Sequence, residues 1–104
     1  MIGIYLDVVF LASIKTIVGK DRIALEINSN QVTLENLITE LANNLGHNFR
    51  DLIINAETKE VNPEILIFIE NREIQTLKKL KTPLSDGNQI VFLSSIHGGF
   101  GVMT

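Results

Sequence analysis

The 104-residue chain contains no cysteine and no tryptophan, and it has only two prolines and one tyrosine. The absence of cysteine excludes disulfide bonds, a thiolate nucleophile, and zinc or iron–sulfur sites built on cysteine ligands. A chain without cysteine also fits a reducing compartment, and we expect a cytoplasmic protein.

The chain also lacks a strong excess of charge. Nine basic and twelve acidic residues give a formal net charge of −3 and a pI near 5.3, which argues against salt-dependent binding to nucleic acid or anionic lipid. The apolar residues 2–12 lack the basic leading segment of a signal peptide and contain Asp7. No apolar run approaches the roughly 20 residues of a membrane span. We therefore expect no direct contact with nucleic acid or membrane.

No catalytic or metal-binding motif is recognisable. His47 and His97 lie 50 positions apart (97 − 47 = 50), with no acidic residue at metal-ligand spacing. The segment 18–20, Val-Gly-Lys, lacks the earlier glycine and the Ser/Thr of a phosphate loop. The glycines after His97 are not accompanied by the Gly-x-Ser-x-Gly turn that would supply a nucleophile. We expect no enzyme activity, no metal site and no bound cofactor.

The hydrophobic pattern of the first half predicts two strands and a helix. Apolar residues alternate along residues 2–10 and again along residues 23–27, which indicates two strands joined by a loop that turns at residues 19–21. An apolar stripe at helical spacing runs through residues 34–45. Thr33 suits the N-cap of that helix, and Gly46 suits its end. A short irregular or helical stretch at residues 47–52 follows.

The second half predicts further strands. After a polar loop at residues 55–63, the apolar run 65–69 is short enough to be a strand, an edge strand lies around Ile74, and residues 90–93 form the last strand. The pattern predicts an α+β, β-grasp fold: a mixed sheet of four to five strands with one main helix, and with the first and last strands parallel at its centre. We expect one domain over residues 1–97 and a flexible tail over residues 98–104.

Two adjacent glycines, Gly98 and Gly99, follow the last predicted strand. A glycine pair enters a narrow active site without side-chain clashes, and a terminal glycine carboxylate is unhindered. Such a carboxylate serves as an acyl donor once it has been activated, usually as an acyl-adenylate. Two residues are a weak motif on their own, and the alternative interpretation is a plain flexible terminus.

The wider sequence resembles the ubiquitin-related modifier family, a β-grasp class related to the small subunit of molybdopterin synthase and to the thiamine sulfur carrier. The resemblance runs from about residue 7 to residue 99. It rests on residues 9–11, 18–22, 32–33, 63–69 and 84–87, and above all on the ending Phe-Leu-Ser-Ser-Ile-His-Gly-Gly at residues 92–99. Three departures are the segment 62–64 (Asn-Pro-Glu, where the family usually has Arg-Pro-Gly), Ile74 (where a tryptophan is common), and residues 100–104, which follow the second glycine.

The resemblance implies that Gly99 becomes the acyl donor after a protease cleaves between Gly99 and Phe100 and removes residues 100–104. An adenylating enzyme of the ubiquitin-activating type would use ATP and magnesium to form the acyl-adenylate, which is then converted to a thiocarboxylate. The sulfur would pass to tRNA through a tRNA thiolase, or Gly99 would be joined to a lysine of a target protein. Three preceding residues would position the tail: Ile96, His97 and Gly98. The open alternatives are a sulfur-carrier subunit of molybdopterin synthase and a binding module without acyl chemistry.

Comparison with ubiquitin also suggests a binding surface. It places Ile90 and Phe92 of the last strand in the core. It places Phe68, Val91 and Leu93 on the opposite face, where ubiquitin carries its recognition patch. We expect these three side chains to be exposed and to bind the activating enzyme. The alternative is that they pack against the polar loop at residues 55–63.

Overall fold

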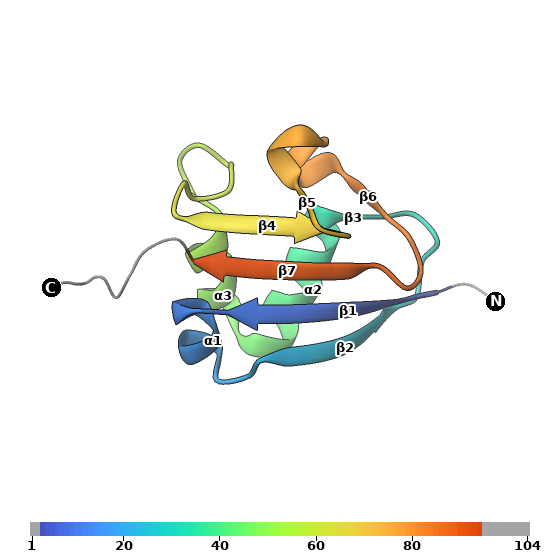
Figure 1. The fold of residues 1–104 in the computed structure, drawn as a ribbon, viewed down its shortest axis with the longest axis horizontal. Coiled ribbons are helices and arrows are strands. Elements are labelled where there is room, and N and C mark those ends of the chain that lie inside the picture. The colour runs from blue at the N-terminus through green and yellow to red at the C-terminus, as the bar shows by residue number, and fades with distance from the viewer. Residues whose placement is uncertain (1–2, 95–104) are drawn as a thin grey trace, which may run out of the picture.

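The computed structural model of the chain describes residues 3–94. Within this range one mixed sheet has the strand order β2-β1-β7-β4-β5 (Figure 1). Its strands are β1 (Ile4–Leu11), β2 (Arg22–Ile27), β4 (Ile65–Ile69), β5 (Arg72–Glu73) and β7 (Gln89–Ser94). β1 and β7 are parallel neighbours at the centre of the sheet, and the other neighbouring strands are antiparallel. This arrangement confirms the predicted β-grasp fold.

The helices of the described range are α1 (Ser13–Val18), α2 (Leu34–Leu45) and α3 (His47–Ile53). α2 and α3 lie behind the sheet in Figure 1 and cover one of its faces. α2 contributes four fully buried side chains to the core: Leu34, Leu37, Ile38 and Leu41. None of the helices in residues 3–94 is long and apolar enough to cross a bilayer.

Three phenylalanine rings join the sheet to the helix layer. The rings of Phe10 in β1 and Phe92 in β7 lie 5.8 Å apart between centroids. Phe49 of α3 meets both edge-on, at 5.9 Å from Phe10 and 5.8 Å from Phe92. Edge-to-face aromatic pairs add to the stabilisation that burial alone supplies. The cluster therefore fixes the centre of the sheet against α3.

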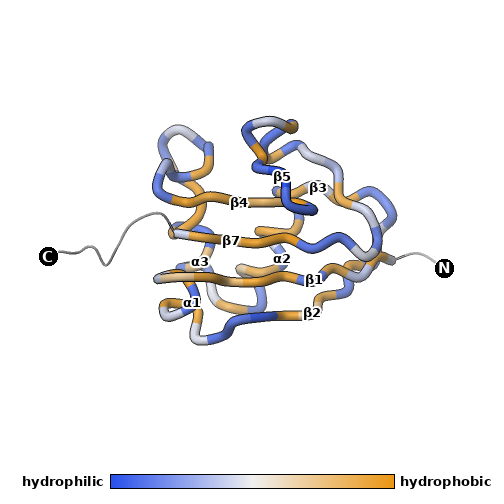
Figure 2. Tube along the Cα trace, in the orientation of Figure 1, coloured by the Kyte–Doolittle hydropathy of each residue, from blue (hydrophilic) through white to orange (hydrophobic). Residues whose placement is uncertain are grey.

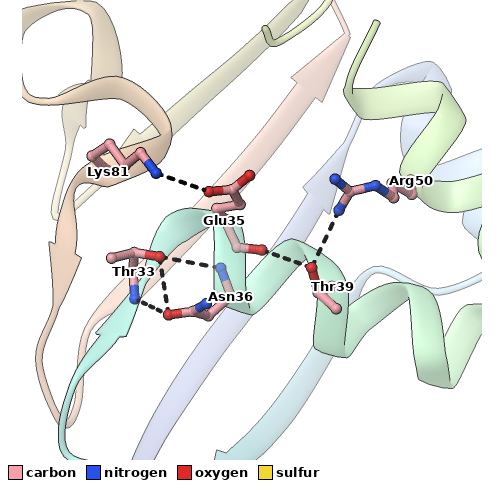
Figure 3. A network of polar contacts seen from close by, with 6 residues as sticks. All are labelled: Thr33, Glu35, Asn36, Thr39, Arg50 and Lys81. Atoms are coloured by element: carbon pink, nitrogen blue, oxygen red, sulfur yellow. Dashed lines mark hydrogen bonds and ion pairs between the residues drawn. The ribbon is translucent and has the colours of Figure 1, made fainter. Parts of the chain in front are cut away.

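α2 begins at the predicted N-cap. The Thr33 hydroxyl accepts a hydrogen bond from the Asn36 backbone N–H at 3.3 Å, and the Asn36 side-chain oxygen accepts one from the Thr33 N–H at 2.8 Å (Figure 3). These reciprocal bonds satisfy backbone donors that the first turn would leave unpaired. Glu35 in the same turn forms an ion pair with Lys81 at 3.5 Å.

The chain changes direction between α2 and α3 at Gly46. Its backbone angles, φ 101° and ψ 151°, lie in a region that is open essentially to glycine alone, which explains why glycine ends the helix here. α3 then lies against α2, and Arg50 Nη1 donates a hydrogen bond to the Thr39 hydroxyl at 3.2 Å (Figure 3). The helical option for the stretch after Gly46 is thus confirmed.

Two local expectations need correction. The link between β1 and β2 is more than a loop, because it contains α1, whose Ile14 is fully buried. The six residues of α1 are too short for a helical period to stand out in the sequence. The edge strand expected around Ile74 is β5, which ends one residue earlier. Ile74 itself begins the 3₁₀-helix η1 (Ile74–Thr76) and is buried.

A second, two-stranded sheet was not predicted. β3 (Val32–Thr33) pairs with β6 (Pro83–Leu84). One residue, Thr82, separates β6 from the preceding 3₁₀-helix η2 (Lys79–Lys81). Strands of two residues carry no periodicity, so the pattern gives no signal for them. The pairing nevertheless orients the cap residue Thr33 at the start of α2.

We predict that Thr33→Val lowers the free energy of unfolding by about 1 kcal/mol, because valine keeps the β-branched shape and removes the capping oxygen. Urea unfolding followed by circular dichroism measures the change. Thr16→Val, at an exposed position in α1, is the matched control and should change stability little. Equal midpoints for Thr33→Val and the unmodified protein would contradict a stabilising cap.

Candidate functional site

β7 is the element that leads into the predicted acyl-donor segment. At its end, Leu93 pairs with Leu11 of β1, and Ser94 pairs with Ile65 of β4. Strands therefore flank β7 on both sides up to its last residues. Because Phe92 is also fully buried against the helix layer, the end of β7 is held firmly in the domain.

The predicted tail residues Ile96, His97, Gly98, Gly99 and Phe100 lie outside the described residues. Gly99 follows Ser94 by five positions (99 − 94 = 5). An extended chain advances at most about 3.6 Å per residue, so the Gly99 carbonyl lies within roughly 18 Å of the end of β7. A protein that acts on Gly99 must therefore approach the domain closely at this end of the sheet.

The sheet face opposite α2 and α3 carries a continuous apolar surface beside the end of β7, which we call the outer patch. Cross-strand pairing arranges it in two rows, Val9–Val91–Phe68 and Leu11–Leu93–Leu66. In Figure 2, β4, much of β7 and the later part of β1 are coloured as hydrophobic along consecutive residues rather than at every second one. These strands are thus apolar on both faces, although α2 and α3 cover only one.

The predicted binding residues Phe68, Val91 and Leu93 all lie in the outer patch, on the expected face. They are half-buried rather than fully exposed, because each packs beside apolar side chains of the neighbouring strands. Ile90 and Phe92 point to the opposite face and are fully buried, as expected. The assignment of the two faces is confirmed, and the binding role of the patch stays a prediction.

The other three members of the outer patch were missed: Val9, Leu11 and Leu66. Leu11 is the most exposed of the six, at 43% of its surface. The signal that could have found them is the absence of polar residues in 8–11 and 65–69. Continuous apolar strands are typical of sheets covered on both faces, and one layer of helices covers only one.

The polar loop at residues 55–63 was the alternative cover for these side chains. Its end is fastened to α3: Asn62 Nδ2 donates a hydrogen bond to the Leu52 carbonyl, and the Asn62 N–H donates to the Ile53 carbonyl, both at 2.8 Å. An isolated bridge also joins Ile54 to Val61. These contacts tie the loop to the helix layer, which favours an outer patch open to a partner.

A polar cluster borders the outer patch at the start of β7. Arg22 of β2 donates from Nε and Nη2 to the two carboxylate oxygens of Asp7, at 2.9 and 3.2 Å. Gln89 Nε2 lies 3.3 Å from Asp7 Oδ2. The Arg22 and Asp7 side chains are 60% and 39% exposed, so solvent screens the pair and it adds little stability. Its main effect is to give the apolar rows a polar rim, which is the usual anatomy of a protein interface.

A surface cavity of about 570 Å³ lies away from this region. It is lined by Ile69, Arg72 and Leu77 among others. Ile69 pairs with Ile90 near the start of β7, so the cavity lies at the opposite end of that strand from the tail. Within residues 3–94, no group of three histidine, aspartate or glutamate side chains is placed to hold a metal ion. The candidate site is therefore the end of β7 with the outer patch.

Comparison with known proteins adds a family relationship. A sequence model of the family described as Urm1 (Ubiquitin related modifier) matches residues 5–99. Ubiquitin-related modifier 1 of Mus musculus is 30% identical over 82 residues, 79% of each chain. The protein of that name from Candida glabrata is 29% identical over 91 residues, 86% of this chain and 93% of the relative. The solution structure of Urm1 from Trypanosoma brucei has a TM-score of 0.75 at 20% identity, covering 93% of this chain and 97% of that one, and shares the β-grasp fold.

We predict that two adjacent residues of β7 differ sharply in their contribution to stability. Phe92→Ala removes a fully buried ring and should lower the free energy of unfolding by about 3–5 kcal/mol. Leu93→Ala truncates a half-buried side chain and should lower it by roughly 1 kcal/mol. Urea unfolding measures both, with Phe92→Leu as a milder variant if Phe92→Ala does not fold. Equal losses would mean that the outer patch is buried in the isolated protein.

Proposed function

Because this chain belongs to the ubiquitin-related modifier family, whose members are ubiquitin-like sulfur carriers and modifiers rather than enzymes, we propose that its working atom is the carbonyl carbon of Gly99. The observation that carries the proposal is the extent of the family match, which ends at Gly99 and leaves residues 100–104 outside it. The firmly held end of β7 and the neighbouring outer patch support it, because a partner that grips the domain there comes within reach of Gly99.

The first step is removal of residues 100–104. In the full chain the Gly99 carbonyl is part of the peptide bond to Phe100 and cannot be adenylated. A protease hydrolyses this bond and frees the Gly99 carboxylate. Gly98 has no side chain, so this segment threads into a narrow active site without clashes. Ile96 and His97 position the tail.

The second step is activation on a separate enzyme. The Gly99 carboxylate attacks the α-phosphorus of ATP, pyrophosphate leaves, and an acyl-adenylate forms. Adenylation activates an otherwise inert carboxyl carbon, because AMP leaves readily when a nucleophile attacks that carbon. The ATP and the magnesium belong to the adenylating partner, and this chain binds no cofactor of its own.

The third step loads sulfur. The terminal sulfur of a persulfide on the partner attacks the Gly99 acyl carbon, and AMP leaves. A second thiol then attacks the resulting sulfur–sulfur bond and releases the thiocarboxylate. Because this chain has no cysteine, every thiol in these steps belongs to a partner. The thiocarboxylate gives its sulfur to tRNA on a tRNA thiolase, or the activated Gly99 is joined to a target lysine. We place these steps in the cytoplasm.

Two alternatives give different products. A molybdopterin synthase subunit would co-purify with a large catalytic subunit and support molybdopterin formation. A β-grasp binding module without acyl chemistry would show only the untrimmed mass in native cells. Intact mass spectrometry of the native protein separates these outcomes. Loss of residues 100–104, or sulfur in place of one carboxylate oxygen, supports the acyl carrier.

We predict that a chain ending at Gly99 supports ATP–pyrophosphate exchange by its cognate activating enzyme and that the 104-residue chain does not. Only the shortened chain presents a free Gly99 carboxylate. Gly99→Ala in the shortened chain should abolish exchange and leave the melting temperature unchanged, because the substitution lies beyond the last strand. Equal exchange by the short and full chains, or by the Gly99→Ala variant, would place the reactive carbonyl elsewhere.

We further predict that Phe68→Ala and Leu93→Ala each weaken binding to the activating enzyme by about 1–2 kcal/mol, the effect of losing an apolar interface anchor. Isothermal titration calorimetry with the shortened chain measures the affinity. Ile17→Ala is the control, since Ile17 is 64% exposed on α1 and lies outside the outer patch. A large fall in melting temperature with unchanged affinity would show that the outer patch stabilises the domain and does not bind the enzyme.

A further inference from the structure

β2 forms a free edge of the main sheet, because within the described residues it pairs with β1 alone. The hydrogen bonds of β1 show which backbone groups of β2 are free. Asp7 donates its N–H to the Asn88 carbonyl at 3.0 Å, and the Tyr5 carbonyl accepts from the Gly87 N–H at 2.7 Å. The odd-numbered residues of β1 therefore direct their backbone groups toward the β7 side. The even-numbered residues direct theirs toward β2.

The same alternation continues in β2. Ile23, Leu25 and Ile27 lie opposite the even-numbered residues of β1 and bond to them. The N–H and C=O groups of Arg22, Ala24 and Glu26 consequently point away from the sheet, along its free edge. The side chains of these three residues are exposed, whereas Ile23, Leu25 and Ile27 are half-buried beside the core. The edge thus offers backbone donors and acceptors next to an apolar margin.

We propose that β2 pairs antiparallel with β2 of a second copy of this chain, about a two-fold axis at Ala24. In this register Arg22 lies opposite Glu26 of the second copy, and Glu26 lies opposite Arg22 of the second copy. Residues 22, 24 and 26 are also the ones whose backbone groups point to the edge, so each opposed pair exchanges two backbone hydrogen bonds. Opposite charges across neighbouring strands stabilise such a pairing.

Neighbouring registers lack this charge match. A two-fold axis at Ile23 places Arg22 opposite Ala24, and an axis at Leu25 places Glu26 opposite Ala24. Neither sets opposite charges of β2 against each other. The register centred on Ala24 also sets Ile23 against Leu25 of the second copy, which covers the apolar margin on the helix side. Hydrogen bonding within β2 and charge therefore favour the register centred on Ala24, and its apolar contacts are compatible with it.

The position of Arg22 suits this contact. Its Nε and Nη2 atoms donate hydrogen bonds to Asp7 on the neighbouring strand, which restrains the guanidinium beside the outer face of the sheet. The Nη1 atom takes no part in these two bonds and is available to Glu26 of the second copy. A guanidinium already held by one carboxylate loses less side-chain freedom when it meets a second.

The dimer leaves the candidate site accessible. β1 lies between β2 and β7, so the end of β7 and the β7–β4 side of the outer patch lie away from the interface. The two-fold axis sends the two β7 strands in opposite directions and keeps both helix layers on one side of the joined sheet. A contact made by one short strand from each copy falls below the roughly 1,200 Å² of stable interfaces, so the dimer is weak and depends on concentration.

A charge-reversal experiment tests the register. Arg22→Glu alone sets two negative side chains opposite each other, and Glu26→Arg alone sets two positive ones. Each variant should weaken self-association at least about tenfold in sedimentation equilibrium. An equimolar mixture of the two variants restores both opposite-charge pairs and should form a heterodimer at least as tight as the unmodified dimer. Arg72→Glu in β5, on the far edge of the sheet, is the control and should leave association unchanged.

Ala24→Pro tests the backbone pairing separately. Proline removes an N–H that points to the free edge, a position at which an edge strand tolerates it. The variant should keep its melting temperature and lose the dimer. A monomer at every concentration of the unmodified protein would overturn the proposal. So would a dimer that withstands Ala24→Pro and both charge reversals, or a mixture that fails to associate.

Discussion

The parallel pairing of β1 with β7 is the contact on which the rest of the structure depends. It joins segments 82 positions apart, as the Gln89–Asp7 side-chain bond illustrates. On the inner face this pairing sets Phe10 beside Phe92, where both rings meet Phe49. On the outer face it extends a row of side chains across the centre of the sheet. One backbone register therefore builds both the core and the candidate site, and a shift by one residue would exchange the two faces of β7.

The sequence predicted the elements whose own residues show a helical or strand hydrophobic pattern or the residues that cap a helix. α2 shows a helical stripe with Thr33 at one end and Gly46 at the other, and both ends lie where expected. The two central strands are apolar enough to be found without knowing their partners. α1 and Ile74 were misassigned for a different reason. A six-residue helix and a two-residue strand form where tertiary packing buries a side chain, such as Ile14, and this is not visible in local periodicity.

The residues of the candidate site also differ in whether the sequence alone could predict them. The face on which Phe68, Val91 and Leu93 lie was predictable because comparison with ubiquitin supplied their positions. Val9 and Leu66 required the actual strand register, which brings them beside these residues from distant parts of the sequence. The charge pattern of β2 lies wholly in the sequence, yet its significance depends on knowing that β2 is an edge and which of its backbone groups face outward. Register is a tertiary property, and hydrophobic alternation alone does not determine it.

The proposed function limits how a partner can approach this chain. The chain brings no thiol of its own, and residues 3–94 hold no group of side chains suited to a metal ion. Under the proposed function, the thiols of the sulfur transfer come from a partner, and the domain contributes recognition and positioning. Ser94 is the last residue of a strand that is flanked by β1 and β4, and Gly99 follows it by five positions (99 − 94 = 5). Under the proposed function, an enzyme that binds the outer patch next to this point therefore has Gly99 within roughly 18 Å of the end of β7. Binding of the outer patch then brings the partner's active site close to the Gly99 carbonyl. The β2 edge lies away from both and stays free for pairing with a second copy.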